Sequence, residues 1–167
     1  ISPYGTVVDL VDWSEWNGSA FSLTTFDDEA TDQITENSAP YYGSFQPLGS
    51  LSDFDQEEMQ GDWTLWVYNS SDFLTVVTDW SIILEYDDST PIDPPVIEGT
   101  EYNGSDFTLT GSDVTTDVLN VSDGGTITDI NVTISGYMEG GGLNYLSFKL
   151  ISPYGTVVDL VDWSEWN

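Results

Sequence analysis

DWTLWVY, residues 62–68, alternates apolar side chains with polar or outward-facing ones along its whole length. A period of two is typical of a β-strand that turns one face toward a core. WSIILEY at residues 80–86 alternates in the same way, as do residues 130–134 and 146–150. The side chains predicted to face inward are Trp63, Leu65, Val67, Trp80, Ile82, Leu84, Ile130, Val132, Ile134, Leu146, Phe148 and Leu150.

The rest of the chain supports the same fold class. Helical periodicity is nearly absent, and the short alternating runs are separated by Gly, Asp, Asn and Pro, which favour turns. Several such strands with frequent turns are typical of two antiparallel sheets packed against each other. We therefore predict an all-β, antiparallel β-sandwich.

One segment of the chain occurs twice. ISPYGTVVDLVDWSEWN fills residues 1–17 and returns unchanged as residues 151–167, which sets a period of 150 residues. A fixed period indicates a tandem array, and a domain-sized unit favours beads on a string over a solenoid. A duplicated cloning remnant is the alternative, but it would not continue the strand pattern. We expect the chain to be a window cut from a longer polymer.

A proline-rich stretch interrupts the strand pattern. DDSTPIDPP at residues 87–95 contains three prolines and has no periodicity. Proline removes backbone donors and holds the chain extended, so this stretch is predicted to be a semi-rigid linker. Residues 1–86 would be the C-terminal part of one repeat and residues 96–167 the N-terminal part of the next. Residues 1–86 should then be completed by the equivalent of residues 96–150 from the preceding copy.

The charge of the chain limits its partners. Thirty acidic residues face one basic residue, Lys149, and the formal net charge is −29. Nucleic acids and anionic membrane surfaces are excluded as partners because both are bound by Lys and Arg, and no apolar run is long enough to insert into a membrane. We expect Lys149 to face outward toward carboxylates. The many Trp, Tyr and Phe residues indicate a folded core, with salt or divalent cations screening the charge.

Five asparagines begin an N-x-Ser/Thr triplet, which is more than chance would supply. They are Asn17, Asn69, Asn103, Asn120 and Asn131. This excess predicts a glycosylated protein that is extracellular or on the cell surface. The chain has no cysteine, so it has neither disulfides nor thiolate metal sites.

Clustered carboxylates make calcium the expected cofactor. Asp27, Asp28 and Glu29 form the densest cluster, and Asp53 with Asp55 is the second candidate. Calcium prefers carboxylate and carbonyl oxygens, although no EF-hand loop is present. A solvated acidic loop is the alternative at each position.

Catalysis is not expected from this chain. It has no histidine or cysteine, and a chain this acidic places carboxylates near one another by accident. We therefore predict that the protein is not an enzyme.

Four large apolar residues are candidates for contact between repeats. Trp66 and Ile83 point away from the predicted core, and Trp13 and Trp16 lie in the polar segment WSEW beside Asn17. Such residues can pack where repeats meet, stack on sugars, or lie under a loop of their own module. We favour contact between repeats, because an array must bury surface between its units to be stiff.

Several segments together resemble the P domain, or homo B domain, of the proprotein convertase type. They are FDDEA at 26–30, AP at 39–40, GSF at 43–45 with Pro47, LSDF at 51–54, GDWTL at 61–65, DWSI at 79–82, INVTI at 130–134 and LISPYGT at 150–156. The resemblance implies a jelly-roll-like sandwich of about eight strands and no catalysis. The chain departs from the family at residues 137–144, where the usual histidine and Gly-Asp-Leu are missing.

These observations support one leading hypothesis and two alternatives. The leading hypothesis is a structural, extracellular filament, stalk or surface adhesin built from tandem domains, whose partners are copies of itself. One alternative is a carbohydrate-binding or protease-accessory module, which would bind glycans or serve a secreted enzyme. The other keeps the filament but builds it from separate subunits that donate strands to one another.

Overall fold

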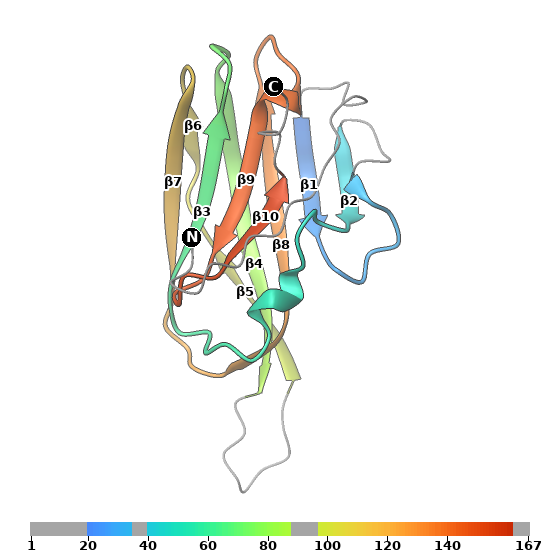
Figure 1. Cartoon of the computed structure of the whole chain (residues 1–167), viewed down its shortest axis with the longest axis vertical. Helices are drawn as coiled ribbons and strands as arrows, with labels where there is room; N and C mark the ends of the chain where they lie inside the picture. The colour runs from blue at the N-terminus through green and yellow to red at the C-terminus, as the bar shows by residue number, and fades with distance from the viewer. Residues whose placement is uncertain (1–19, 35–39, 88–96, 162–167) are drawn as a thin grey trace, which may run out of the picture.

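The computed structural model describes residues 20–34, 40–87 and 97–161 (Figure 1). These residues form ten strands and two short 3₁₀ turns. They are β1 (Ala20–Phe26), β2 (Tyr41–Phe45), η2 (Leu51–Phe54), β3 (Gly61–Asn69), β4 (Thr75–Asp87), β5 (Ile97–Asn103), β6 (Phe107–Leu109), β7 (Asp113–Val121), β8 (Thr126–Met138), η3 (Leu143–Tyr145), β9 (Leu146–Ile151) and β10 (Val157–Val161). The all-β prediction is confirmed. No helix in this part of the chain is long and apolar enough to cross a membrane.

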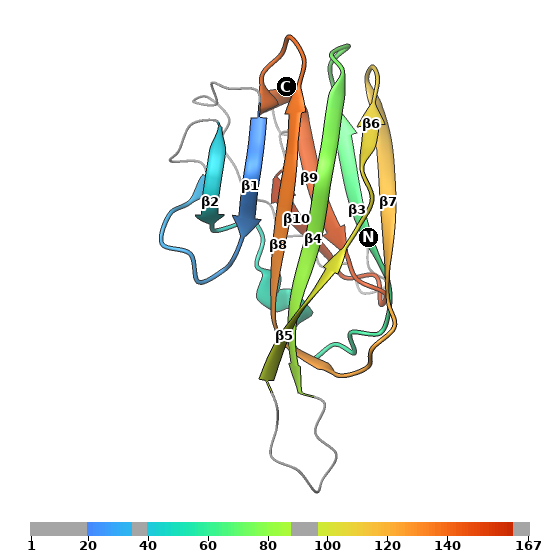
Figure 2. The same cartoon turned by 180° about the vertical axis from the view of Figure 1, so that it is seen from behind.

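The strands form two sheets. The six-stranded sheet has the order β2-β1-β8-β4-β5, with β6 also paired to β4, and the four-stranded sheet has the order β10-β9-β3-β7. Figure 1 shows β3, β9 and β10 in front of β4 and β8, and Figure 2 shows the same elements from behind. The two sheets therefore lie as layers.

One hydrophobic core is shared by both sheets. All twelve side chains predicted from the alternating stretches to face inward are at most 1 % exposed, which confirms their assignment. The ring of Phe21 on β1 meets the ring of Phe148 on β9 edge-on at 5.3 Å between centroids. Trp63 on β3 meets Phe54 of η2 in the same manner at 5.2 Å. Burial of alternate side chains from two layers accounts for the period of two in the sequence.

The prediction that all strands are antiparallel is wrong for one pair. β2 runs parallel to β1, with Phe26 opposite Phe45, so the six-stranded sheet is mixed. Parallel neighbours need a crossing connection longer than a hairpin. The chain between β1 and β2 provides it, and Gln33 in this connection forms a further parallel bridge with Gln46, the residue after β2.

The described chain divides into two parts that are interleaved in space. We call residues 20–87 the first half and residues 97–161 the second half. Six strand pairings join the two halves, namely β1–β8, β3–β7, β3–β9, β4–β5, β4–β6 and β4–β8, whereas β1–β2 and β9–β10 each lie within one half. Asp87, predicted to begin the linker, is the last residue of β4 and pairs with Ile97 of β5. The remaining linker residues lie outside the described ranges.

Candidate functional site

The repeated segment contributes a hairpin to the fold. Its described residues, 151–161, form the end of β9, a turn and β10, and we call them the repeat hairpin. In the turn, Ser152 donates its backbone N–H to the carbonyl of Thr156 at 2.9 Å, and Gly155 donates to the carbonyl of Ser152 at 2.9 Å. Gly155 has a φ of 86°, which favours glycine. The turn is therefore encoded by the ISPYGT motif itself.

The repeat hairpin is anchored in the domain. All five residues of β10 are buried, and β10 pairs with β9. The N–H of Gly49 donates to the carbonyl of Asp159 at 2.9 Å, and the hydroxyl of Thr156 donates to the carboxylate of Glu57. Both contacts join the hairpin to the first half of the chain.

Lys149 is the only cation in the chain, and it holds a buried carboxylate. Its Nζ lies 2.6 Å from Oδ1 of Asp159, whose side chain is only 1 % exposed, while the Lys149 side chain is 24 % exposed. The same Nζ lies 5.4 Å from the centroid of the Trp66 ring. The prediction that Lys149 faces carboxylates is confirmed, although its partner belongs to the repeated segment.

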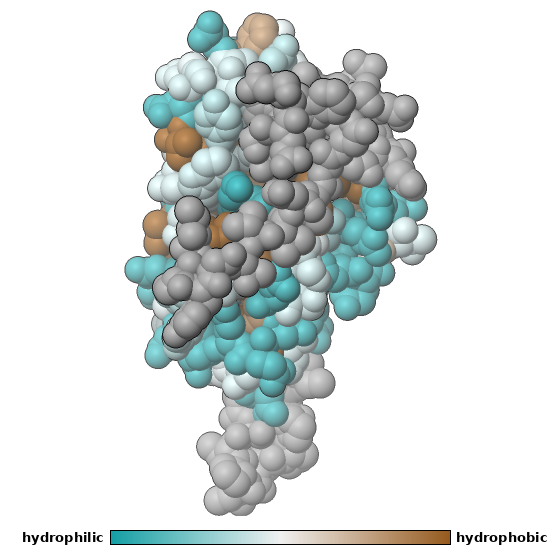
Figure 3. Space-filling model, in the orientation of Figure 1, coloured by the Kyte–Doolittle hydropathy of each residue, from teal (hydrophilic) through white to brown (hydrophobic). Residues whose placement is uncertain are grey.

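Two of the four residues predicted to contact a neighbouring repeat, Trp66 and Ile83, lie in the described part of the chain. Trp66 and Ile83 are half-buried on the sides of their strands away from the core residues. Trp66 lies beside Tyr68, with 6.1 Å between ring centroids, while Trp13 and Trp16 lie outside the described residues. On the neighbouring strand β7 the side chains of Val114 and Val118 are 43 % and 54 % exposed. Figure 3 shows a mainly hydrophilic described surface on this face, interrupted by separate apolar spots.

Two of the predicted calcium ligands, Asp27 and Asp28, accept hydrogen bonds from backbone N–H groups. Asp28 accepts hydrogen bonds from the N–H groups of Leu51 and Ser52 at 3.0 and 2.9 Å, and from the hydroxyl of Ser50 at 2.9 Å. Asp27 accepts from the N–H of Glu29 at 2.8 Å. Carboxylates are common acceptors for such free amides at turns and helix starts. These contacts give Asp27 and Asp28 a structural role that the sequence alone did not reveal.

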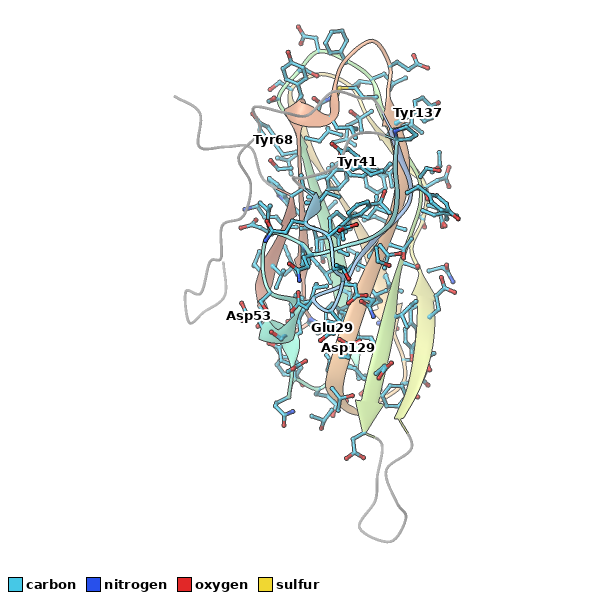
Figure 4. The ribbon with its side chains drawn as sticks, turned by 90° about the vertical axis from the view of Figure 1, so that its right-hand side faces the viewer. Glu29, Tyr41, Asp53, Tyr68, Asp129 and Tyr137 are labelled. Atoms are coloured by element: carbon cyan, nitrogen blue, oxygen red, sulfur yellow. The ribbon has the colours of Figure 1, made fainter. Side chains whose placement is uncertain are left out.

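Two of the remaining acidic candidates, Glu29 and Asp55, lie near Asp129 of β8. Burial raises the pKa of Glu29, and the nearby Asp129 and Asp27 raise it further. Burial also raises the pKa of Asp129, with Glu85, Asp27 and Asp55 adding to it, and burial together with Asp28 raises the pKa of Asp55. Figure 4 shows Glu29 and Asp129 lying near each other, and sequence reasoning missed Asp129 because it lies on a different strand.

Metal binding at this cluster stays a prediction. Within residues 20–34, 40–87 and 97–161, no group of three carboxylates is arranged to hold a metal ion. Asp53 lies on η2 and is exposed. Burial is the main cause of the raised pKa values of Glu29, Asp55 and Asp129, and the neighbouring carboxylates add to it, so protonation or a nearby cation would be favourable here.

The cluster leads to a pH prediction. The raised pKa values of Asp129, Asp55 and Glu29 mean that the folded state binds protons more tightly than the unfolded state. Their stabilisation is complete below the ordinary values of 3.8 and 4.5 and is lost as the pH rises through the raised values. The contribution of these groups to the free energy of unfolding, measured with urea, should therefore increase as the pH falls from neutral. Asp129→Asn should weaken this dependence of the free energy of unfolding on pH, whereas Asp106→Asn, at an exposed position, should leave it unchanged. If the free energy of unfolding of Asp129→Asn varies with pH as that of the wild type does, Asp129 does not contribute to the dependence.

The predicted glycan acceptors differ in accessibility. Asn103 and Asn120 are exposed, and the Nδ2 of Asn120 donates to Asp62 at 2.7 Å. Asn131 is half-buried, with its Nδ2 3.1 Å from Oδ2 of Asp129. Asn17 lies outside the described residues. Exposure at Asn103 and Asn120 leaves room for a glycan.

The structure contradicts the prediction of a glycan at Asn69. This side chain is 0 % exposed. Its Nδ2 donates to the carbonyl of Phe73 at 2.8 Å and to the hydroxyl of Thr75 at 3.2 Å, and its Oδ1 accepts from the N–H and the hydroxyl of Ser71 at 2.9 and 2.8 Å. The triplet Asn-Ser-Ser therefore organises the turn between β3 and β4, which explains these residues without a glycan.

Asn69→Ala should lower the free energy of unfolding by about 2–3 kcal/mol, because several buried groups lose their partner at once. Asn103→Ala, in an exposed acceptor triplet, should change it by less than about 0.5 kcal/mol. Chemical unfolding of both variants measures the difference. Equal effects, or a glycan found on Asn69 by mass spectrometry of the folded protein, would overturn this role.

Comparisons of the chain with protein-family models, with curated proteins and with solved structures found no match.

Proposed function

We propose that this chain is a segment of a tandem-repeat structural protein that forms an extracellular filament, stalk or surface adhesin. The observation that carries the proposal is the place of the repeated segment in the fold. Residues 151–161 form a hairpin whose second strand, β10, is buried and contributes Val158, Leu160 and Val161 to the core, so packing constrains the sequence of that strand. Each further period would bring the same hairpin and the same strands, and would therefore build another copy of the domain.

The proposed domain is a jelly-roll-like β-sandwich of the P-domain type. Two sheets with one shared core support the sandwich, and the burial of Trp63, Trp80 and Phe54 within the resembling segments supports the family. The repeat boundaries proposed from the sequence are residues 1–86, a linker at 87–95, and residues 96–167; of the linker, Asp87 belongs to β4. No catalytic role is proposed for any residue.

The proposed surroundings are outside the cell. Glycans on the exposed Asn103 and Asn120 would cover a surface that already carries a strong negative charge. Burial raises the pKa of Asp129 and of Glu29, and repulsion between carboxylates adds to it; calcium bound near them would offset that repulsion. Trp66 and Ile83, with Trp13 and Trp16, are the proposed contacts between neighbouring repeats.

Immunogold electron microscopy of the source cells tests this function. An antibody raised against the 167-residue chain should label thin filaments or stalks at regular intervals along their length. The same antibody absorbed beforehand with the purified chain is the control and should give no label. Label found only on dispersed molecules in the culture fluid would contradict a filament.

Carbohydrate binding is the second candidate, favoured by the half-exposed Trp66 beside Tyr68 on the outer side of the four-stranded sheet. Aromatic rings of this kind stack on sugars. A glycan array should then show binding that Trp66→Ala removes and that Ile83→Ala, on the other sheet, leaves intact. A protease-accessory role would in addition require a catalytic domain in the same protein.

A further inference from the structure

Most of the strand pairings among the described residues join the two halves of the chain. β4 of the first half is flanked by β8 on one side and by β5 and β6 on the other, all from the second half. β3 lies in the same way between β9 and β7. The two longest strands, β4 and β8, pair from Thr75 with Met138 to Asp87 with Thr126.

Side chains add specificity to this surface. Trp80 of the first half is fully buried, and its indole N–H donates to Asp117 of the second half at 2.8 Å. The carbonyl of Trp80 accepts from the N–H of Gly104 at 2.9 Å. A Cβ on Gly104 would overlap the Trp80 ring, so the absence of a side chain there lets the indole pack. The two halves are therefore complementary in shape as well as in hydrogen bonding.

Neither half can form all the backbone hydrogen bonds of its own strands. β3 and β4 belong to different sheets and so cannot pair with each other. Without the second half, both edges of each strand would therefore be unpaired. Without the first half, β8 would lose both of its neighbours, β1 and β4. Unpaired edges of apolar strands are costly in water and readily bind another strand. Each half therefore needs a complementary half, but nothing in the pairing requires it to come from the same copy.

The repeat places a second complementary half close by. Val161 at the end of β10 lies opposite Phe148, and the Phe148 ring contacts Phe21 at the start of β1. Because residues 151–167 repeat residues 1–17, a following first half would begin after eight connecting residues beyond Val161. Eight extended residues reach about 26–29 Å, whereas neighbouring strands and facing sheets are about 5 and 10 Å apart. A second half could therefore pair with the first half before it or with the first half after it.

We propose that this surface is an exchange interface, in which the first half of one copy pairs with the second half of another copy of the same chain. The strand pairings and the core are then identical to those within one chain, and only the connections differ. Such an exchange is a low-cost route to association: between two copies it gives a dimer, and repeated head to tail it gives an open chain. The proposal rests on the proposed function only in that an array places copies next to one another.

Two full-length variants with defects in opposite halves test the exchange. Ile82 and Val132 are paired across β4 and β8 and are both fully buried, so Ile82→Asp and Val132→Asp should each prevent folding. Refolded together, the intact first half of the Val132→Asp chain and the intact second half of the Ile82→Asp chain can form one unaltered domain. The mixture should regain about half of the wild-type near-ultraviolet circular dichroism and sediment as a complex of two chains.

The matched control mixes two defects in the same half. Ile82→Asp with Leu84→Asp leaves no intact first half, so this mixture should stay unfolded. If the Ile82→Asp and Val132→Asp mixture also stays unfolded while the wild-type chain refolds under the same conditions, the exchange proposal is wrong. That result would leave the filament proposal standing, because labelling of filaments on cells tests it separately.

A second variant removes the connection between the halves. Asp87 and Ile97 are antiparallel partners, and joining them directly leaves no residues for the reversal, which needs a loop of at least about two residues. Deletion of residues 88–96 should therefore give folded dimers or larger species. Replacing the same nine residues with Gly and Ser should leave the wild-type size distribution unchanged. A deletion variant that is monomeric, folded or not, would overturn the proposal.

Discussion

Lys149→Met is expected to lower the free energy of unfolding by about 3 kcal/mol. The substitution keeps most of the apolar stem but leaves the carboxylate of Asp159, which is 1 % exposed, without its cation. Removing one partner of a buried ion pair costs about 3–5 kcal/mol. The lower end applies here, because the Lys149 side chain retains 24 % exposure and water can partly solvate the site. The cation–π contact with Trp66 is lost as well and adds to the effect.

Chemical unfolding at neutral pH measures this loss, and the double variant Lys149→Met with Asp159→Asn is its control. Removal of both charges should recover most of the lost stability, since the penalty comes from the uncompensated carboxylate. A single variant within about 0.5 kcal/mol of the wild type would show that Asp159 is not held by Lys149 in solution. The chain has no other Lys or Arg that could replace Lys149.

Trp80→Ala is expected to cost about 3–5 kcal/mol, which is a large part of the 5–15 kcal/mol typical of a folded domain. The indole fills the space over Gly104 and donates to Asp117, which also accepts from the N–H of Ser105 at 2.8 Å. Truncation leaves a cavity at the surface that joins the two halves. It also removes one donor from Asp117.

The same substitution at Trp66 is the control. Trp66 is half-buried on the outer side of β3 and not in the core, so Trp66→Ala should cost only about 1 kcal/mol. Thermal and urea unfolding of the two variants should differ accordingly. Similar losses for both would mean that Trp80 is not the central contact that its burial indicates.

The inward faces of the long strands could be predicted from sequence because one physical rule sets them. Residues such as Trp63, Ile82 and Val132 recur every second position, and a strand with one face in a core permits no other arrangement. The outward direction of Lys149 followed from the same alternation. These features depend only on local order along the chain.

The strands between residues 97 and 121 could not be predicted in this way. In β7 only Leu119 and Val121 are buried, and its other side chains are exposed or half-buried, so it has little apolar alternation. Its place is set by pairing with β3 along its whole length. The parallel pairing of β2 with β1 is likewise a consequence of the crossing connection and leaves no mark in the period of either strand.

The candidate site was predicted only in part, because side-chain roles depend on distant neighbours. Asp28 was assigned to calcium from its local cluster, whereas the structure shows it binding amides more than twenty residues away. Asp129 was missed because its acidic neighbours come from other segments. Asn69 matched a glycosylation triplet, but the same residues form a buried turn.

We propose that the domain is a unit of a covalent tandem array. The most direct test is the mass of the assembled protein, measured after denaturation and removal of glycans. We expect a species many times heavier than the 18.4 kDa of this chain. A species close to the mass of one period would contradict it, because each subunit would then carry only one set of the two halves.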